Sequence, residues 1–173
     1  PKIIKGLLPP LYDYIIKGST GQGKWMRRPW IALLNPDVTD KASEGYFVAY
    51  AFPTDTTSVN LALCQGQNEA IKQYGKKSSA ALNKQADLMR MKISEFETHF
   101  SAEPNKDPSS KAKYRQGDIY IKEYDFNDLP SESVLLDDLF KMLEAYETLF
   151  FRGGRDSDAF DDDGPSTDKE IAI

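Results

Sequence analysis

Residues 18–30 could bind both the sugar-phosphate strand and an unstacked base of a nucleic acid. The segment reads Gly-Ser-Thr-Gly-Gln-Gly-Lys-Trp-Met-Arg-Arg-Pro-Trp. Glycines let a backbone approach a phosphate closely, lysines and arginines neutralise phosphates, and tryptophans stack on bases. From residue types alone, a glycine turn followed by two core tryptophans with solvated arginine heads explains the segment at least as well.

Residues suited to enzymatic chemistry are few in this sequence. His99 is the single histidine, and a lone histidine completes neither a zinc site nor a catalytic triad. Cys64, the single cysteine, ends an expected strand without an activating neighbour, so we expect it to pack in the core. The glycine segment lacks the full pattern of a nucleoside-triphosphate loop. We therefore expect no enzyme activity, no catalytic residue, no metal site and no cofactor.

The net charge of −5 comes from one end of the chain. Residues 153–173 carry two basic and seven acidic side chains, whereas residues 1–152 are neutral. Basic side chains predominate in residues 1–30 and 72–122, and acidic ones in residues 123–150. The acidic balance therefore does not exclude a nucleic-acid-binding body. We expect residues 1–152 to form one DNA-binding domain and residues 153–173 to form an acidic linker or disordered tail.

Hydrophobic periodicity predicts the elements that must position these residues. Alternation within residues 46–52 gives one strand face to Phe47, Ala49 and Ala51 and the other face to larger side chains. Three glycines within residues 18–23 predict a loop. The expected strands are 30–34, 46–52, 58–64 and 117–124, and the expected helices are 68–74, 78–100 and a final helix from Ser131 or Ser133 to Phe150.

These elements predict an α+β fold. We expect a mixed or antiparallel central sheet that contains a β-hairpin. A long helix and a C-terminal amphipathic helix should flank this sheet. No apolar run approaches the roughly 18 residues of a membrane span, and no signal-peptide pattern opens the sequence. Together with the single cysteine, which suits a reducing compartment, this predicts a cytoplasmic protein.

Four motifs within residues 17–66 resemble a known family. They are Lys-Gly-Ser-Thr-Gly-Gln-Gly-Lys-Trp from residue 17, Pro-Trp-Ile-Ala-Leu-Leu from residue 29, Gly-Tyr-Phe-Val-Ala-Tyr-Ala-Phe from residue 45 and Leu-Ala-Leu-Cys-Gln-Gly from residue 61. Their order and spacing resemble the N-terminal domain of McrB-type restriction proteins, which recognise modified cytosine in DNA. Residues 113–117 and the closing helix fit the same family more loosely.

The resemblance implies base flipping, in which the modified cytosine leaves the duplex and enters an aromatic and aliphatic pocket. Matched residue by residue, the pocket positions are Trp30, Phe47, Ala51 and Tyr114. The loop that fills the vacated space would be Gly21, Gln22 and Gly23. The contacts to the DNA backbone would come from Ser19, Thr20, Lys24, Arg27 and Arg28.

Three positions depart from the family pattern. The family's model member has a bulky aliphatic residue where Ala51 stands, and tyrosines where Phe47 and Gln22 stand. An alanine in the pocket wall predicts a larger cavity, suited to hydroxymethyl- or glucosyl-cytosine as well as to 5-methylcytosine. Phe47 lacks one hydroxyl, and Gln22 would hydrogen-bond the orphan guanine instead of stacking on it.

The predicted function is therefore recognition of modified cytosine in double-stranded DNA, as the targeting module of a restriction system. Cleavage of the DNA would depend on a nuclease or motor in another domain or subunit. One alternative is a protein-interaction module in which the acidic helix 131–150 docks a basic partner. Another is a regulatory domain that binds a nucleotide or small molecule in the same aromatic pocket.

Overall fold

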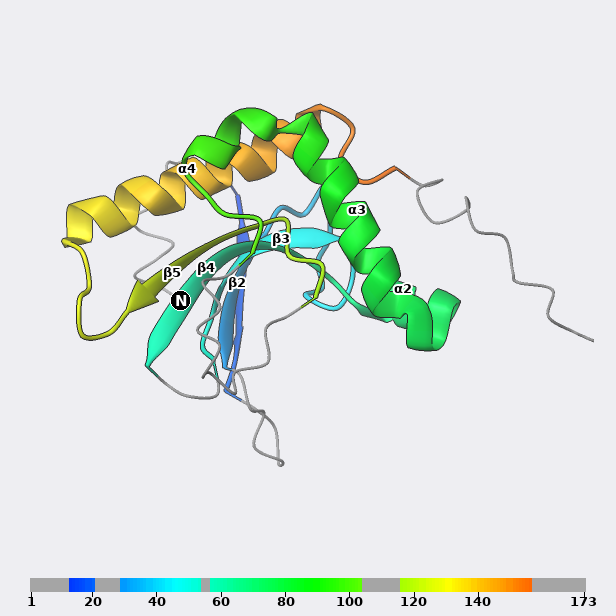
Figure 1. The fold of residues 1–173 in the computed structure, drawn as a ribbon, viewed down its shortest axis with the longest axis horizontal. Helices are drawn as coiled ribbons and strands as arrows, with labels where there is room; N and C mark the ends of the chain where they lie inside the picture. Colours follow the sequence, from blue (N-terminus) through cyan, green and yellow to red (C-terminus); the bar gives the residue numbers. More distant parts are fainter. Residues whose placement is uncertain (1–12, 21–28, 54–56, 104–115, 157–173) are drawn as a thin grey trace, which may run out of the picture.

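The chain folds around a five-stranded antiparallel sheet whose strand order follows the sequence (Figure 1). The computed structural model describes residues 13–20, 29–53, 57–103 and 116–156. The strands are β1 (Ile15–Ser19), β2 (Trp30–Leu34), β3 (Tyr46–Ala51), β4 (Ser58–Gln65) and β5 (Tyr120–Asp125). The helices are α2 (Asn68–Tyr74), α3 (Ser78–Lys92) and α4 (Glu132–Phe151), with two short 3₁₀ turns, η1 (Gly75–Lys77) and η2 (Ser94–Thr98).

The predicted α+β class is confirmed, and the sheet is antiparallel throughout its described strands. The β3–β4 pair is the expected hairpin, and α2 has the expected bounds. In α4, the Ser131 hydroxyl accepts a hydrogen bond from the Val134 backbone N–H, as an N-cap does. Local capping and turn signals were therefore sufficient to predict where these elements begin and end.

Three predicted boundaries were wrong. Gly18 and Ser19 belong to β1 because they pair with Ile31 and Trp30, and an edge strand tolerates glycine. The long helix stops at Lys92, since Ile93 leaves the helical conformation and becomes completely buried. The last strand begins at Tyr120, after a turn in which Gly117 has a φ of 80°.

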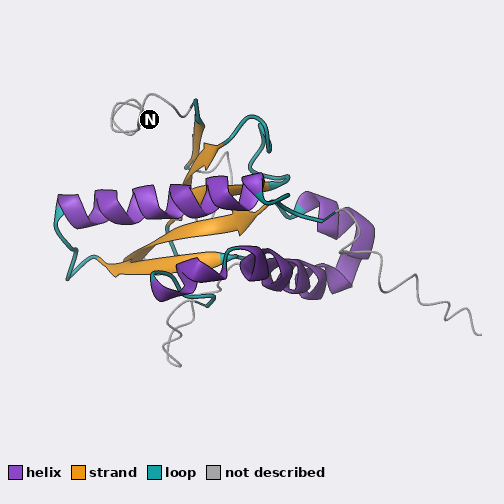
Figure 2. Ribbon diagram, turned by 90° about the horizontal axis from the view of Figure 1, so that it is seen from above, coloured by secondary structure: helices purple, strands orange, loops and turns teal. Residues whose placement is uncertain are grey.

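One face of the sheet, which we call the helix-covered face, carries Tyr46, Val48, Leu61, Leu63 and Tyr124. These residues share a face because they alternate along the strands and pair across them. Figure 2 shows α4 lying along the sheet, and α4 contacts β3 and β4. The buried residues that α4 contributes are Leu139, Met142, Leu143, Ala145, Tyr146 and Leu149.

Tyr146 connects α4 to the sheet through its hydroxyl. This side chain is 0% exposed. Its oxygen accepts a hydrogen bond from the Asn35 backbone N–H at 2.9 Å and donates one to the Tyr46 carbonyl at 3.0 Å. The neighbouring Glu147 carboxylate accepts from the Tyr14 hydroxyl at 2.6 Å and from the Asn35 side-chain amide. These bonds hold α4, the start of β1 and the end of β2 in one arrangement.

Residues 153–156 pack against the body of the domain. Gly154 has a φ of 60°, and a Cβ at this position would lie 2.2 Å from the Tyr46 hydroxyl oxygen. The Lys92 ammonium donates to the Gly154 carbonyl at 2.9 Å, and Arg155 pairs with Glu69. The boundary after residue 152 remains a prediction, and the acidic run 161–163 lies outside the described residues.

We predict that Tyr146→Phe lowers the free energy of unfolding by about 1–3 kcal/mol, the usual cost of leaving a buried polar group without its partner. Tyr50→Phe is the matched control, because the Tyr50 hydroxyl makes no hydrogen bond within the described residues. Chemical denaturation of the two variants measures the difference. Equal stabilities would contradict the role assigned to the Tyr146 hydroxyl.

Candidate nucleic-acid interface

The opposite side of the sheet, which we call the cavity face, carries a group of small side chains at its centre. Trp30 lies directly opposite Ala51, and Ala49 lies between Ala32 on β2 and Ala62 on β4. Phe47 lies opposite Cys64 at the far end of β3. Because directly paired residues of antiparallel strands point to the same side, these side chains form one continuous surface.

A cavity of about 740 Å³ opens above this surface. Trp30, Phe47 and Ala51, three of the four predicted pocket residues, all line it. Trp30 lies at one end of the cavity and is half-buried, whereas Phe47 is only 1% exposed and belongs to the cavity floor. Ala49 and Ala62 complete the floor, and their methyl groups leave room that larger side chains would fill.

Polar residues from four other segments line the end of the cavity nearest α2 and α3. The loop between β2 and β3 contributes Lys41 and Ser43, and the start of α2 contributes Gln67 and Asn68. The first turn of α3 contributes Ser78 and Ser79, and the turn before β5 contributes Gln116 and Asp118. The cavity thus has an apolar end at the sheet and a polar end at the helices.

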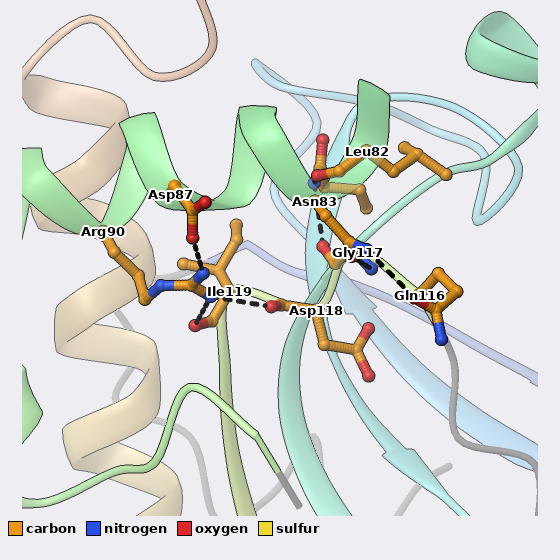
Figure 3. A network of polar contacts seen from close by, with 9 residues as sticks. Leu82, Asn83, Asp87, Arg90, Gln116, Gly117, Asp118 and Ile119 are labelled. Carbon is orange, nitrogen blue, oxygen red and sulfur yellow. Dashed lines mark hydrogen bonds and ion pairs between the residues drawn. The ribbon is translucent and has the colours of Figure 1, made fainter. Parts of the chain in front are cut away.

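The turn before β5 is held against α3 by several hydrogen bonds (Figure 3). The Arg90 guanidinium donates to the Asp118 carbonyl at 3.1 Å and to the Ile119 carbonyl at 2.9 Å. The Asn83 amide oxygen accepts from the Gly117 backbone N–H at 2.9 Å, and its nitrogen donates to the Gln116 side chain at 3.0 Å. This turn therefore has a fixed position where it borders the cavity.

Gln65 also connects the turn before β5 to α3, from inside the fold. Its side chain is 0% exposed, and its amide nitrogen donates to the Leu82 carbonyl at 2.9 Å and to the Gly117 carbonyl at 2.8 Å. Leu82 itself lines the cavity. The end of β4, the first turns of α3 and the turn before β5 are consequently one packed unit.

Two lysines and one carboxylate give the described lining its charge. Lys17 and Lys41 border the cavity, and the Lys17 ammonium donates to the Asp40 carbonyl. Asp118 is the one acidic side chain among the described lining residues, and Figure 3 shows its carboxylate directed away from α3. Lysines attract phosphates, whereas a carboxylate accepts hydrogen bonds from amino groups such as cytosine N4. Within the described residues, no cluster of His, Cys, Asp and Glu could hold a metal ion.

The structure describes the predicted site only in part. Ser19 lies opposite Trp30 at the end of β1, and Thr20 is exposed beyond it. Cys64 is buried as expected and also lines the cavity, while His99 is exposed. The predicted residues that lie outside the described part of the chain are Gly21, Gln22, Gly23, Lys24, Arg27, Arg28 and Tyr114.

Sequence reasoning missed the polar end of the cavity and Lys17. Lys17 could have been found, because alternation along β1 puts it on the same side as Ser19, the partner of Trp30. Asn68 and Ser78 had no such signal, because only the docking of α2 and α3 beside the sheet brings them to the cavity. None of the described helices is long and apolar enough to span a membrane.

The geometry is consistent with a known family of domains. The chain matches the family model described as MrcB-like, N-terminal domain over residues 3–150. The chain belongs to this family. No curated relative matches it. Membership in the MrcB-like, N-terminal domain family supports a DNA-binding recognition module of a restriction-type system, which is not itself the catalytic part.

We predict that Gly117→Ala is more destabilising than Gly75→Ala. Both glycines have positive φ angles, but a Cβ at Gly117 would lie 2.6 Å from the Leu82 Cβ, whereas a Cβ at Gly75 meets nothing within 4 Å. A positive φ strains an alanine at both positions, and the overpacking at Gly117 adds about 1–3 kcal/mol. Thermal or chemical unfolding compares the two, and a smaller loss at Gly117 would show that the turn yields easily.

Proposed function

We propose that this domain binds duplex DNA carrying a modified cytosine and takes the flipped base into the cavity. The observation that supports this most is the half-buried indole of Trp30, which opens onto a cavity of about 740 Å³ instead of being enclosed in the core. A flipped base needs a flat apolar partner beside open space, and Trp30 with the alanine floor offers both.

The connection between β1 and β2 supports the same role. Ser19 pairs with Trp30, so the glycine-rich segment between them leaves and rejoins the sheet beside the indole. We propose that Gly21, Gln22 and Gly23 enter the space that the flipped base vacates. Lys24, Arg27 and Arg28 would bind phosphates there, together with Ser19 and Thr20, and Tyr114 would supply a further aromatic wall of the pocket.

The energies required are consistent with this pocket. Removing a base from the stack costs a few kcal/mol, and stacking on an aromatic side chain returns about 1–3 kcal/mol. Hydrogen bonds to the base edge must supply the remainder.

Within the proposed system, this domain selects the DNA and another domain or subunit cleaves it. Lys17, Lys41 and the cations of the glycine segment would provide sequence-independent affinity, which falls as salt rises. The cavity would provide the preference for the modified base. These two contributions are separable by experiment, because only the first depends strongly on ionic strength.

A second candidate is a domain that binds a free nucleotide or another small molecule. The cavity volume supports it, because about 300–1,000 Å³ is typical of small-molecule sites. Calorimetry with the free modified nucleoside and with the modified duplex separates the candidates. Binding of the nucleoside as tightly as the duplex would favour the second one.

We predict that Trp30→Ala abolishes the preference for modified DNA. Loss of the stacking surface should weaken binding to the modified duplex by roughly one to two orders of magnitude, while weak, salt-sensitive binding to any duplex remains. Gel shifts at two salt concentrations, with duplexes that differ at a single cytosine, measure both effects.

Phe151→Ala is the control for Trp30→Ala. Phe151 is an aromatic residue that is 90% exposed at the end of α4 and does not line the cavity. Its removal should leave both affinities unchanged. If the Trp30 variant keeps its preference for the modified duplex, the pocket assignment is wrong.

A further inference from the structure

The cavity extends well beyond the position that a stacked base would occupy. Trp30 and Ala51 mark one end, and Phe47 lies four residues along β3, about 13 Å away at the usual strand rise. Past Phe47 the lining continues onto α2 and the first turn of α3. A base on Trp30 would therefore leave the helical end of the cavity unfilled.

Hydroxyl and amide side chains from three segments converge on this helical end. Ser43 comes from the loop before β3, Gln67 and Asn68 from the start of α2, and Ser78 and Ser79 from the first turn of α3. None of these five side chains has a hydrogen-bond partner within the described part of the chain. Their donors and acceptors are consequently available to a ligand. We call these five residues the polar end group.

The backbone that carries the polar end group is closely packed. The Asn68 backbone N–H donates to the Ser43 carbonyl at 3.1 Å, and the Gly66 N–H donates to the Gly45 carbonyl at 2.8 Å. A Cβ at Gly66 would lie 2.2 Å from the Glu44 nitrogen, so the two segments lie directly against each other. Fixed backbone positions for these side chains lower the entropic cost of binding a ligand.

The chemistry of the polar end group matches that of a sugar. Hydroxyl and amide groups both donate and accept hydrogen bonds, as sugar hydroxyls do. A methyl substituent could use none of these groups. A monosaccharide attached through a hydroxymethyl linker extends from the base toward Phe47 and carries the hydroxyls to bond with the polar end group.

We propose that the polar end group binds a sugar-sized, hydroxylated substituent on C5 of the flipped cytosine. This inference rests on the proposed function, because it assumes that a flipped cytosine occupies the apolar end. It identifies glycosylated hydroxymethylcytosine as the preferred modification. The alanine floor leaves room for the substituent, and the polar end group provides selectivity for its hydroxyls.

The test is a binding series on four duplexes that differ at one base: cytosine, 5-methylcytosine, 5-hydroxymethylcytosine and glucosyl-hydroxymethylcytosine. We expect the wild-type domain to bind the glucosylated duplex most tightly. Asn68→Ala and Gln67→Ala should each weaken that binding about fivefold, the effect of losing roughly 1 kcal/mol of hydrogen bonding. Neither substitution should change the affinity for the methylated duplex.

Gln73→Ala is the matched control, because Gln73 is exposed on α2 and does not line the cavity. It should leave all four affinities unchanged. Ser79→Trp tests the same site by obstruction. Ser79 is exposed, so the fold should accept the larger side chain, which should exclude the glucosylated duplex while the methylated one still binds.

Failure of this inference and failure of the proposed function give different results. If the wild-type domain prefers the methylated duplex and rejects the glucosylated one, the sugar site is wrong and modified-cytosine recognition stands. If Asn68→Ala weakens binding to every modified duplex alike, the polar end group does not read the substituent. If all four duplexes bind equally, the proposed function itself is wrong.

Discussion

The distribution of side-chain size between the two faces of the sheet is the constraint on which the rest of the structure depends. Large residues such as Leu33, Val48 and Leu61 occupy the helix-covered face, while Ala32, Ala49 and Ala62 occupy the cavity face. A protein interior is packed without large voids, so small side chains on an uncovered face leave space that a ligand can fill. The same cross-strand register therefore produces both the core and the cavity.

Helix α3 connects these two sides of the domain. Met89 in its last turns is buried in the core, and the Tyr120 hydroxyl donates to the carbonyl of Ile93, which follows the helix. The first turn of the same helix lines the cavity with Ser78 and Ser79. Because one rigid helix contributes to both the core and the cavity, the polar end of the cavity is positioned by contacts made in the core. The hydroxyl of Tyr146 similarly holds α4 against the sheet from the opposite side of the cavity floor.

In the proposed function, this arrangement divides the recognition of DNA into two physical tasks. Cations around the cavity can attract any DNA, and their effect decreases as salt screens the charges. The cavity would accept a base that has left the stack, and its contribution would depend on shape and hydrogen bonding. The cavity is formed by a rigid sheet face and by the packed first turns of two helices. Little order has to be created on binding, so selectivity does not require a large interface. A module with these properties needs no catalytic groups of its own.

The sequence by itself determined the elements whose signals are local. Alternation within β3 indicated that Phe47, Ala49 and Ala51 share a face, and Ser131 and Gly75 indicated where α4 begins and α2 ends. The resemblance to a known family selected Trp30, Phe47 and Ala51, which the structure brings into one cavity. These conclusions needed only neighbouring residues or recognisable motifs.

Tertiary structure alone decided which residues complete the cavity. Ser43, Asn68 and Ser79 are distant in sequence, and no local pattern relates them to Trp30. Their meeting depends on how α2 and α3 dock beside the sheet, which is set by packing between remote side chains. Tertiary contacts also ended the long helix at Lys92, because burial of Ile93 outweighed helical propensity. Local preferences amount to a few tenths of a kcal/mol per residue, whereas burial of a large apolar side chain contributes about 1.5–3 kcal/mol.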